Sequence, residues 1–503
     1  MLISVTALYA QKHPNSVAYK DYKRPDTASI FKRVDDSFRL WQSYLLVREA
    51  NNGNPLAQHE VGLRYLTGNG FKADTVKAFY WIKKAADQNL KAANYNLGIL
   101  YNNGWGTEWN PFNAFKRFSK AAKDSMPEAI YVLGLLYTDN LIVPKNYEKA
   151  FRYVAKASEM KYKPADEILL EFYKRGIGEV FDTNFAVRKS HMKDSVLFGQ
   201  DITDPAENIT FLNYEKDSLK NDDLTLLKEV LRDGSNEMRD ALGVELKNDS
   251  TFTADSSVIF FVKQAADYGS PEALVMFGRC YEKGIVVTKD LVTAAMYYLR
   301  AMRLESPRAP LLLWELVQNK EFISQLKKKL DQKNSDAQFV DASLFILGID
   351  NTLNEKVALK MLEDSANKNN LAALVELGFL NQSGSFIDVN KEKALALWKK
   401  AKKNGSKEAE IRILMAQIQA NDSESINDSL ITKLKFHEQK GSLLAQMMLA
   451  YIYENGLGIQ KNKPEAVHYY RICAQRGNRG AQRSLKRLYD EIRPGEQEFI
   501  VLD

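Results

Sequence analysis

The sequence offers few residues whose type and spacing could support catalysis or metal binding. A structural zinc site needs Cys and His ligands at short spacings, and many zinc proteases carry an HExxH helix. Neither pattern occurs, and Cys280 and Cys473 are far apart in sequence, with no CxxC pair. We therefore expect no metal site and no disulfide framework. The five histidines, which we assign to core or surface positions, are His13, His59, His191, His437 and His468.

Paired glycines are the next candidates, because a Gly-rich loop can hold a phosphate group. Gly68 with Gly70 and Gly104 with Gly106 form two such G-x-G pairs. A phosphate-binding loop would follow a strand and carry a lysine or serine in a fixed frame, and neither condition is met here. No GxSxG nucleophile motif appears either. We predict no catalytic and no cofactor-binding residues, and we interpret these glycines as helix terminators.

Composition narrows the possible function classes further. The chain has 503 residues, 45% of them hydrophobic and 27% charged, with a net charge of +6. No run of about 18 apolar residues occurs, so we expect no transmembrane segment. The mild net charge is unlike the basic stripe of a nucleic-acid-binding protein, so we expect no nucleic-acid partner.

The N-terminus could carry a targeting signal. Residues 1–10 hold an apolar stretch that ends in alanine before a polar segment, as the end of a signal peptide does. The basic region that normally precedes such a stretch is missing, so either the true start lies upstream or this is a mature apolar N-terminus. We favour a periplasmic or secreted location over a cytoplasmic one.

An internal repeat dominates the rest of the chain. Alanines recur every 36 residues, and in the first three units a glycine stands five residues later and a tyrosine eight residues later. Residues at these spacings lie on neighbouring parts of one helix, and the glycine lets a second helix approach closely. The marker alanines are Ala57, Ala93, Ala129, Ala165, Ala273 and Ala309, followed in a shifted register by Ala337, Ala373, Ala409, Ala445 and Ala481.

Each unit also carries a helix stop and a helix start. A glycine eleven residues past the alanine, such as Gly68, can end a helix in the left-handed conformation. An Asp or Asn seventeen residues past it, such as Asp74 or Asn110, can cap the next helix. The second helix then carries small residues and aromatics. Stacked hairpins bury the faces that each would leave exposed alone, so we predict an all-α fold, an α/α solenoid of helical hairpins.

These markers together resemble the Sel1-like repeat family, relatives of the tetratricopeptide repeats. The resemblance covers residues 52–190 and 258–490 and rests on five markers at fixed offsets. It implies an α/α solenoid that serves as an adaptor or scaffold for other proteins, and it does not imply an enzyme. Some relatives with cysteine pairs in each repeat are linked to penicillin binding or β-lactam hydrolysis, but this chain lacks those pairs.

The markers divide the chain into segments. They fade between about 191 and 257, although the phase of the repeat survives, and the unit at 309–336 is eight residues short. The basic C-terminal residues could attract an acidic partner, but we interpret them as a solvated end of the solenoid. The predicted segments are 1–51, an N-terminal segment with a capping helix; 52–195, a first repeat array; 196–257, degenerate hairpins; 258–331, further repeats; 332–475, a second array; and 476–503, a C-terminal cap.

The fold implied by the resemblance also suggests where a partner binds. First helices line the inner surface of such stacks, and positions two and nine residues past the marker alanine should point into the groove. Aromatic, amide and acidic side chains at these positions could hold a peptide. The predicted partner-binding residues are His59, Tyr95, Asn102, Tyr131, Glu282 and Glu454.

Three functions remain open on the sequence alone. We favour a non-enzymatic adaptor or scaffold that binds a protein or peptide on the concave face of the solenoid. A cell-wall or β-lactam hydrolase of the Sel1-like type is the enzymatic alternative. A passive structural spacer in the cell envelope is the third.

Overall fold

All regular secondary structure in the described part of the chain is helical. The computed structural model describes residues 43–174, 177, 230, 256–350, 352–420, 426–495 and 499, and its regular elements are all helices. Within these residues no helix is long and apolar enough to cross a membrane. The all-α prediction is confirmed. The segment 196–257 and the possible signal-peptide remnant at 1–10 lie outside the described residues, apart from Val230 and the first residues of the helix at 256.

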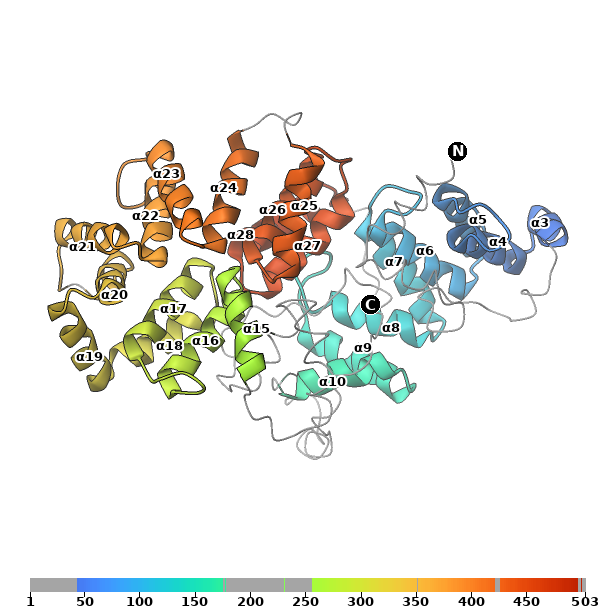
Figure 1. The fold of residues 1–503 in the computed structure, drawn as a ribbon. Coiled ribbons are helices and arrows are strands. Elements are labelled where there is room, and N and C mark those ends of the chain that lie inside the picture. Colours follow the sequence, from blue (N-terminus) through green and yellow to red (C-terminus); the bar gives the residue numbers. More distant parts are fainter. Residues whose placement is uncertain are drawn as a thin grey trace. The chain divides into compact units, whose positions relative to one another are not determined.

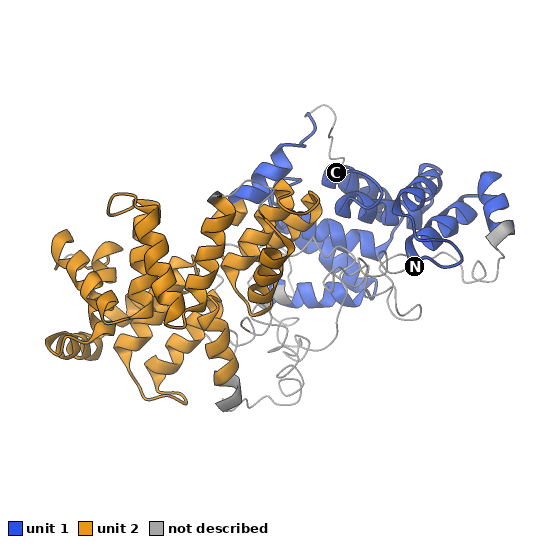
Figure 2. Cartoon of the chain, turned by 45° about the horizontal axis from the view of Figure 1, so that its top comes forward, with its two compact units in different colours: residues 1–213, 483–503 blue, residues 214–482 orange. Residues whose placement is uncertain are grey.

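The chain forms two compact units, drawn in different colours in Figure 2. Unit 1 is residues 1–213 with 483–503, and unit 2 is residues 214–482. The helices described in unit 1 are α3 (Ser43–Asn51), α4 (Pro55–Thr67), α5 (Thr75–Asp87), α6 (Lys91–Asn103), α7 (Pro111–Lys123), α8 (Pro127–Leu136), α9 (Tyr147–Glu159), α10 (Lys163–Lys174) and most of α28 (Arg479–Asp490).

Unit 2 holds the helices from α15 to α27. The shortened unit of the repeat keeps both of its helices, α18 and α19. Its first helix is shorter than in other units, since α18 has 9 residues where α16 has 13. The helices are α15 (Ser256–Asp267), α16 (Pro271–Lys283), α17 (Leu291–Arg303), α18 (Ala309–Val317), α19 (Lys320–Asp331), α20 (Ser335–Ile346), α21 (Glu355–Asn367), α22 (Leu371–Ser383), α23 (Lys391–Lys403), α24 (Lys407–Ala420), α25 (Asp428–Gln439), α26 (Leu443–Asn455) and α27 (Lys463–Gln475).

Consecutive helices pair as hairpins in both units (Figure 1). The boundaries follow the predicted markers. Gly68 ends α4 with a left-handed φ of 69°, and its N–H bonds to the Arg64 carbonyl. Six residues later, the Asp74 side chain accepts a hydrogen bond from the Lys77 amide and starts α5. The left-handed conformation of Gly68, which costs glycine little energy, therefore ends α4, and the N-cap of Asp74 begins α5.

Within a hairpin, one close contact sets the distance between the two helices. A Cβ added at Gly98 of α6 would lie 2.6 Å from Cε1 of Phe118 on α7, so only glycine fits there. The same contact recurs with other bulky partners, and Trp398 also donates to the Val375 carbonyl at 3.3 Å. The equivalent pairs, each twenty residues apart, are Gly62–Ile82, Gly134–Val154, Gly278–Tyr298 and Gly378–Trp398. The predicted role of these glycines is thus confirmed.

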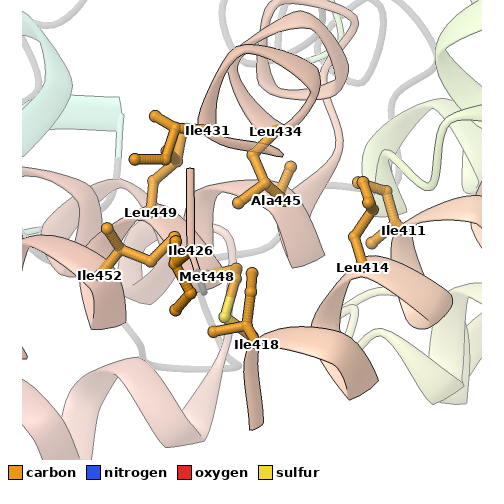
Figure 3. Packing of buried hydrophobic residues seen from close by; sticks show 10 residues of the cluster. All are labelled: Ile411, Leu414, Ile418, Ile426, Ile431, Leu434, Ala445, Met448, Leu449 and Ile452. Carbon is orange, nitrogen blue, oxygen red and sulfur yellow. The ribbon is translucent and has the colours of Figure 1, made fainter. Parts of the chain in front are cut away.

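Apolar side chains between successive hairpins form a shared core. In unit 2, α24, α25 and α26 meet in a cluster shown in Figure 3. Because each helix supplies only a few residues to such a cluster, no hairpin completes a core alone, as expected for a repeat protein. The cluster contains Ile411, Leu414, Ile418, Ile426, Ile431, Leu434, Ala445, Met448, Leu449 and Ile452.

Unit 2 is closed by a buried arginine that joins its first and last hairpins. The Arg476 side chain is fully buried, although the sequence suggested a solvated C-terminal cap beginning at this residue. It donates to both oxygens of Glu272 at 3.1 and 2.8 Å, to Gln446 at 2.7 Å and to the Gly441 carbonyl at 2.9 Å. Residues 204 positions apart are therefore held together by charge-assisted hydrogen bonds.

The C-terminal segment packs against the first array in unit 1. Arg493 donates to the carbonyl groups of Leu141 at 2.6 Å and Ile142 at 3.3 Å, and its guanidinium lies 5.2 Å from the Phe112 ring centroid. The Phe499 ring meets Phe112 edge to face at 5.2 Å. These contacts explain why residues 483–503 group with unit 1.

Replacing Gly98 tests the interhelical contact. We expect Gly98→Leu to lower the free energy of unfolding by about 1–3 kcal/mol, because the new side chain must displace Phe118. Adding Phe118→Leu should recover part of the loss. Urea denaturation followed by circular dichroism measures both effects. Gly495→Leu is the control, since a Cβ at Gly495 meets nothing within 4 Å. Equal losses for Gly98→Leu and Gly495→Leu would contradict the assigned contact.

Replacing Arg476 tests the closure of unit 2. Arg476→Met leaves the Glu272 carboxylate buried without its partner, so we expect a loss of about 3–5 kcal/mol in the free energy of unfolding. The double variant Arg476→Met with Glu272→Leu removes both charges and should lose less. Arg152→Met is the control, because the Arg152–Glu148 pair is exposed, with side chains 71% and 47% accessible. If denaturation curves give the same loss in the free energy of unfolding for Arg476→Met as for Arg152→Met, Arg476 does not close unit 2.

Candidate functional site

The predicted groove residues are mostly buried. His59 is 2% exposed, Tyr95 0%, Asn102 2%, Tyr131 4% and Glu454 8%. The expectation that these five side chains point into an open groove is therefore wrong. The side chain of Glu282, the sixth, is 27% exposed. Whether any of the six contacts a partner is untested, and their role in binding stays a prediction.

Internal contacts account for most of these side chains. In unit 1, Nε2 of His59 lies 2.7 Å from Nδ2 of Asn96, and the Tyr95 ring lies 5.7 Å from Phe118. The Tyr131 ring lies 5.4 Å from that of Tyr162. The spacing from the marker alanine therefore identifies positions on one helix face but does not reveal that neighbouring helices cover that face.

The two glutamates have a common structural role. Glu282 accepts a hydrogen bond from the Tyr298 hydroxyl at 2.5 Å, and Glu454 accepts one from the Tyr470 hydroxyl at 2.8 Å. In each case the tyrosine lies on the second helix of the same hairpin, sixteen residues on. Burial and the Glu282 carboxylate both raise the pKa of Tyr298, which keeps the hydroxyl protonated as the donor. These glutamates tie the two helices of a hairpin together.

A cavity of about 220 Å³ lies inside unit 2. Helices α15, α17, α20, α22 and α24 all contribute to its lining, together with the turn before α24. Its wall is partly apolar, from Phe339 and Val375, and partly charged. The charged lining residues are Lys263, Asp267, Arg300, Arg303, Glu376, Lys407, Glu408 and Arg412. It is the candidate functional site because residues from five helices converge on it.

Two arginines of the cavity are firmly paired. Arg303 on α17 forms a fork with Glu376 on α22, with Nε donating to Oε2 at 2.9 Å and Nη2 bonded to Oε1. Arg412 donates from Nη2 and Nε to Oε1 of Glu408, at 2.9 and 3.2 Å, within α24. The bidentate Arg303–Glu376 pair holds both partners in a fixed orientation, and two donors of Arg412 hold one oxygen of Glu408.

Arg300 is held more loosely than the other two. Its Nη2 lies 3.4 Å from Oε2 of Glu408 and 3.4 Å from the Ala266 carbonyl oxygen, and both distances are long for a hydrogen bond. Its side chain is 17% exposed and lines the cavity. Three guanidinium groups thus share two carboxylates, and the cluster carries an excess positive charge.

The electrostatics of Glu408 reflect this excess. Burial alone would raise the pKa of Glu408, but Arg412 and Arg300 lower it by more, and the net shift is downward. Glu408 is therefore an anion at neutral pH, and both of its oxygens are engaged by arginines. A carboxylate held in this way positions cations and is a poor proton acceptor.

The sequence pattern could not identify this cavity. Its arginines and glutamates come from repeats far apart in the chain, and Arg300 and Glu408 are separated by 108 residues. Two pairs of lining residues, Glu408 with Arg412 and Lys263 with Asp267, lie four residues apart on one helix and could be recognised locally. Among the described residues, no group of three or more His, Cys, Asp or Glu side chains is arranged to hold a metal ion.

Comparison with known proteins supports the repeat assignment. The family model of the Sel1 repeat matches residues 55–90, 91–125, 127–162, 271–306, 371–406 and 443–478. These matches confirm the resemblance that the marker residues indicated. A search of the curated proteins found no match.

Two solved structures are similar to this chain. One is a protective antigen present in uropathogenic Escherichia coli strains that displays an SLR fold; it is 21% identical, with 90% of this chain and 83% of that chain covered and a TM-score of 0.30. The other is a Sel1 repeat protein from Oxalobacter formigenes, which is 19% identical, with 70% of this chain and 89% of that chain covered and a TM-score of 0.21.

The lowered pKa of Glu408 predicts a pH effect on stability. A carboxylate with a depressed pKa stabilises the fold above its unfolded pKa, and this contribution is lost as pH falls through the folded pKa. We expect Glu408→Gln to be less stable than the parent at pH 7. Its stability should also fall less steeply between about pH 5 and pH 3.

Urea denaturation at a series of pH values measures this difference. Glu363→Gln is the control, because the Glu363 side chain is 53% exposed and pairs with Lys393 only at 3.7 Å. A Glu408→Gln variant whose stability follows the same pH curve as the parent would show that the arginines do not stabilise the Glu408 anion.

Proposed function

We propose that this chain, a Sel1-like repeat protein, is a non-enzymatic adaptor or scaffold that binds a protein or peptide at the cavity of unit 2. Solenoids of Sel1 repeats are typically non-catalytic scaffolds for protein interactions. The observation that carries the proposal is the convergence of five helices on one partly charged cavity. A peptide segment entering it would contact several repeats at once.

The state of the polar groups supports binding over catalysis. Glu376 and Glu408 are both engaged by arginines, so neither carboxylate is poised to accept a proton. The Ser406 hydroxyl, which also lines the cavity, accepts a hydrogen bond from the Ala409 amide at 3.1 Å and caps α24. These groups keep their geometry, while exposed side chains at the rim remain available to a partner.

The rim also carries apolar surface that a peptide could cover. Leu371 opens α22 and is 38% exposed, and Ala372 and Val375 follow it along the lining. Interfaces typically combine such apolar contact with a few oriented polar groups. We therefore place the contact surface at this rim, because five of the six groove residues proposed from the sequence are buried.

Site-specific photocrosslinking tests the proposal. A photoreactive amino acid at Leu371 should give a crosslinked partner when the chain is incubated with an extract of its source cells. The same amino acid at Val76 of α5, which is 65% exposed and lies in unit 1, should not give that product. The added substitution Ala372→Trp, which fills the cavity, should abolish the product at Leu371.

Two results would contradict the adaptor function at this site. One is a product at Leu371 that persists unchanged in the Ala372→Trp background. The other is turnover of a β-lactam or a muropeptide by the purified chain that Ala372→Trp abolishes, since that would indicate a hydrolase.

A further inference from the structure

We infer that the cavity of unit 2 binds a carboxylate group of an acidic peptide, with Arg300 as its main contact. This inference rests on the proposed function and names the chemistry of the partner. It starts from the imbalance of charge in the wall, where two lysines and three arginines face three carboxylates, and the three guanidinium groups share only two of these, Glu376 and Glu408. A carboxylate from a ligand would balance the third guanidinium.

The geometry selects Arg300 over its two neighbours. Arg303 and Arg412 each make two hydrogen bonds to one carboxylate, which occupy much of their donor capacity. Both described hydrogen bonds of Arg300 come from Nη2 at 3.4 Å, although a guanidinium carries five N–H donors. A ligand carboxylate can therefore bond to Arg300 without breaking a strong internal pair.

Two helix starts add to the attraction for an anion. Helix α22 begins at Leu371 and α24 begins at Lys407, and both residues line the cavity. The N-terminal end of a helix carries a partial positive charge and amide groups without partners in the helix. The charge imbalance and the helix starts favour the same kind of ligand group.

The size of the cavity and its rim point to a peptide. A volume of about 220 Å³ takes one side chain or a chain end and leaves the rest of a ligand outside. Outside it would meet Lys263 and Lys407, which are exposed residues of the lining. Lys263 pairs with Asp267 at 2.7 Å, and Lys407 lies 5.9 Å from the Tyr268 ring. Because cations lie both inside the cavity and at its rim, they can contact several consecutive acidic residues at once. A peptide with such residues therefore fits better than a single small acid.

Fluorescence anisotropy with a labelled peptide tests the inference on the full chain. The probe carries four consecutive glutamates, and the matched peptide carries four glutamines. We expect the glutamate peptide to bind at least about tenfold more tightly, because hydrogen bonds to charged groups contribute more than neutral ones. The preference should weaken as salt is added.

Variants identify the contact. Arg300→Gln should weaken binding of the glutamate peptide by about tenfold or more. Arg152→Gln, which removes an exposed arginine in unit 1, should leave it unchanged. Lys407→Gln changes an exposed rim residue, so it should keep the fold even where Arg300→Gln does not, and it should weaken binding by a few fold.

The outcomes separate this inference from the function on which it rests. Equal binding of both peptides, abolished by Ala372→Trp, would overturn the carboxylate preference and keep a peptide-binding cavity. If Arg300→Gln and Lys407→Gln both bind the glutamate peptide as tightly as the parent, the peptide does not bind at this cavity. If free glutamate displaces the labelled peptide at the same concentration as the unlabelled peptide does, the ligand is a small acid. That result would overturn the inference that the ligand is a peptide.

Discussion

The contact between a glycine on the first helix and a bulky side chain on the second determines how each of five hairpins packs. At Gly98 there is no room for a Cβ beside Phe118, and Gly378 meets the Trp398 ring in the same way. Because helices this close bury small and large groups in fixed register, the hairpin becomes a rigid unit. The stacking of such units then decides where their remaining side chains lie, including those that could meet a partner.

Stacking alone would leave unit 2 an open array of hairpins. Ion pairs between residues far apart in sequence also join its non-consecutive helices. Arg476 joins the start of α16 to α26 and the end of the last hairpin, and Arg303 joins α17 to α22. Such buried pairs require nearly complete hydrogen bonding to offset the loss of hydration, and the bonds of Arg476 meet that requirement. The Arg303–Glu376 pair lies in the wall of the cavity, and residues of five helices line that wall, so no single repeat forms the cavity.

This hierarchy explains which features the sequence predicted. Gly68 and Asp74 mark a helix end and a helix start through local backbone chemistry, so the hairpins, the helical class and the repeat family could all be derived from spacing. The groove positions failed because spacing defines a helix face and not its neighbours, and Tyr95 is covered completely. The cavity could not be predicted, since Arg300 and Glu408 meet only after several repeats have stacked.

The same closure sets a limit on the charge that the cavity can carry. Several unpaired cations in one site would repel one another and destabilise the unit. Glu376 and Glu408 remove most of that repulsion by engaging Arg303 and Arg412. The remaining excess resides on Lys407 at the rim and on Arg300, whose side chain is 17% exposed. A scaffold can tolerate such a partly solvated cation without a ligand. The same cation attracts an acidic partner to this cavity.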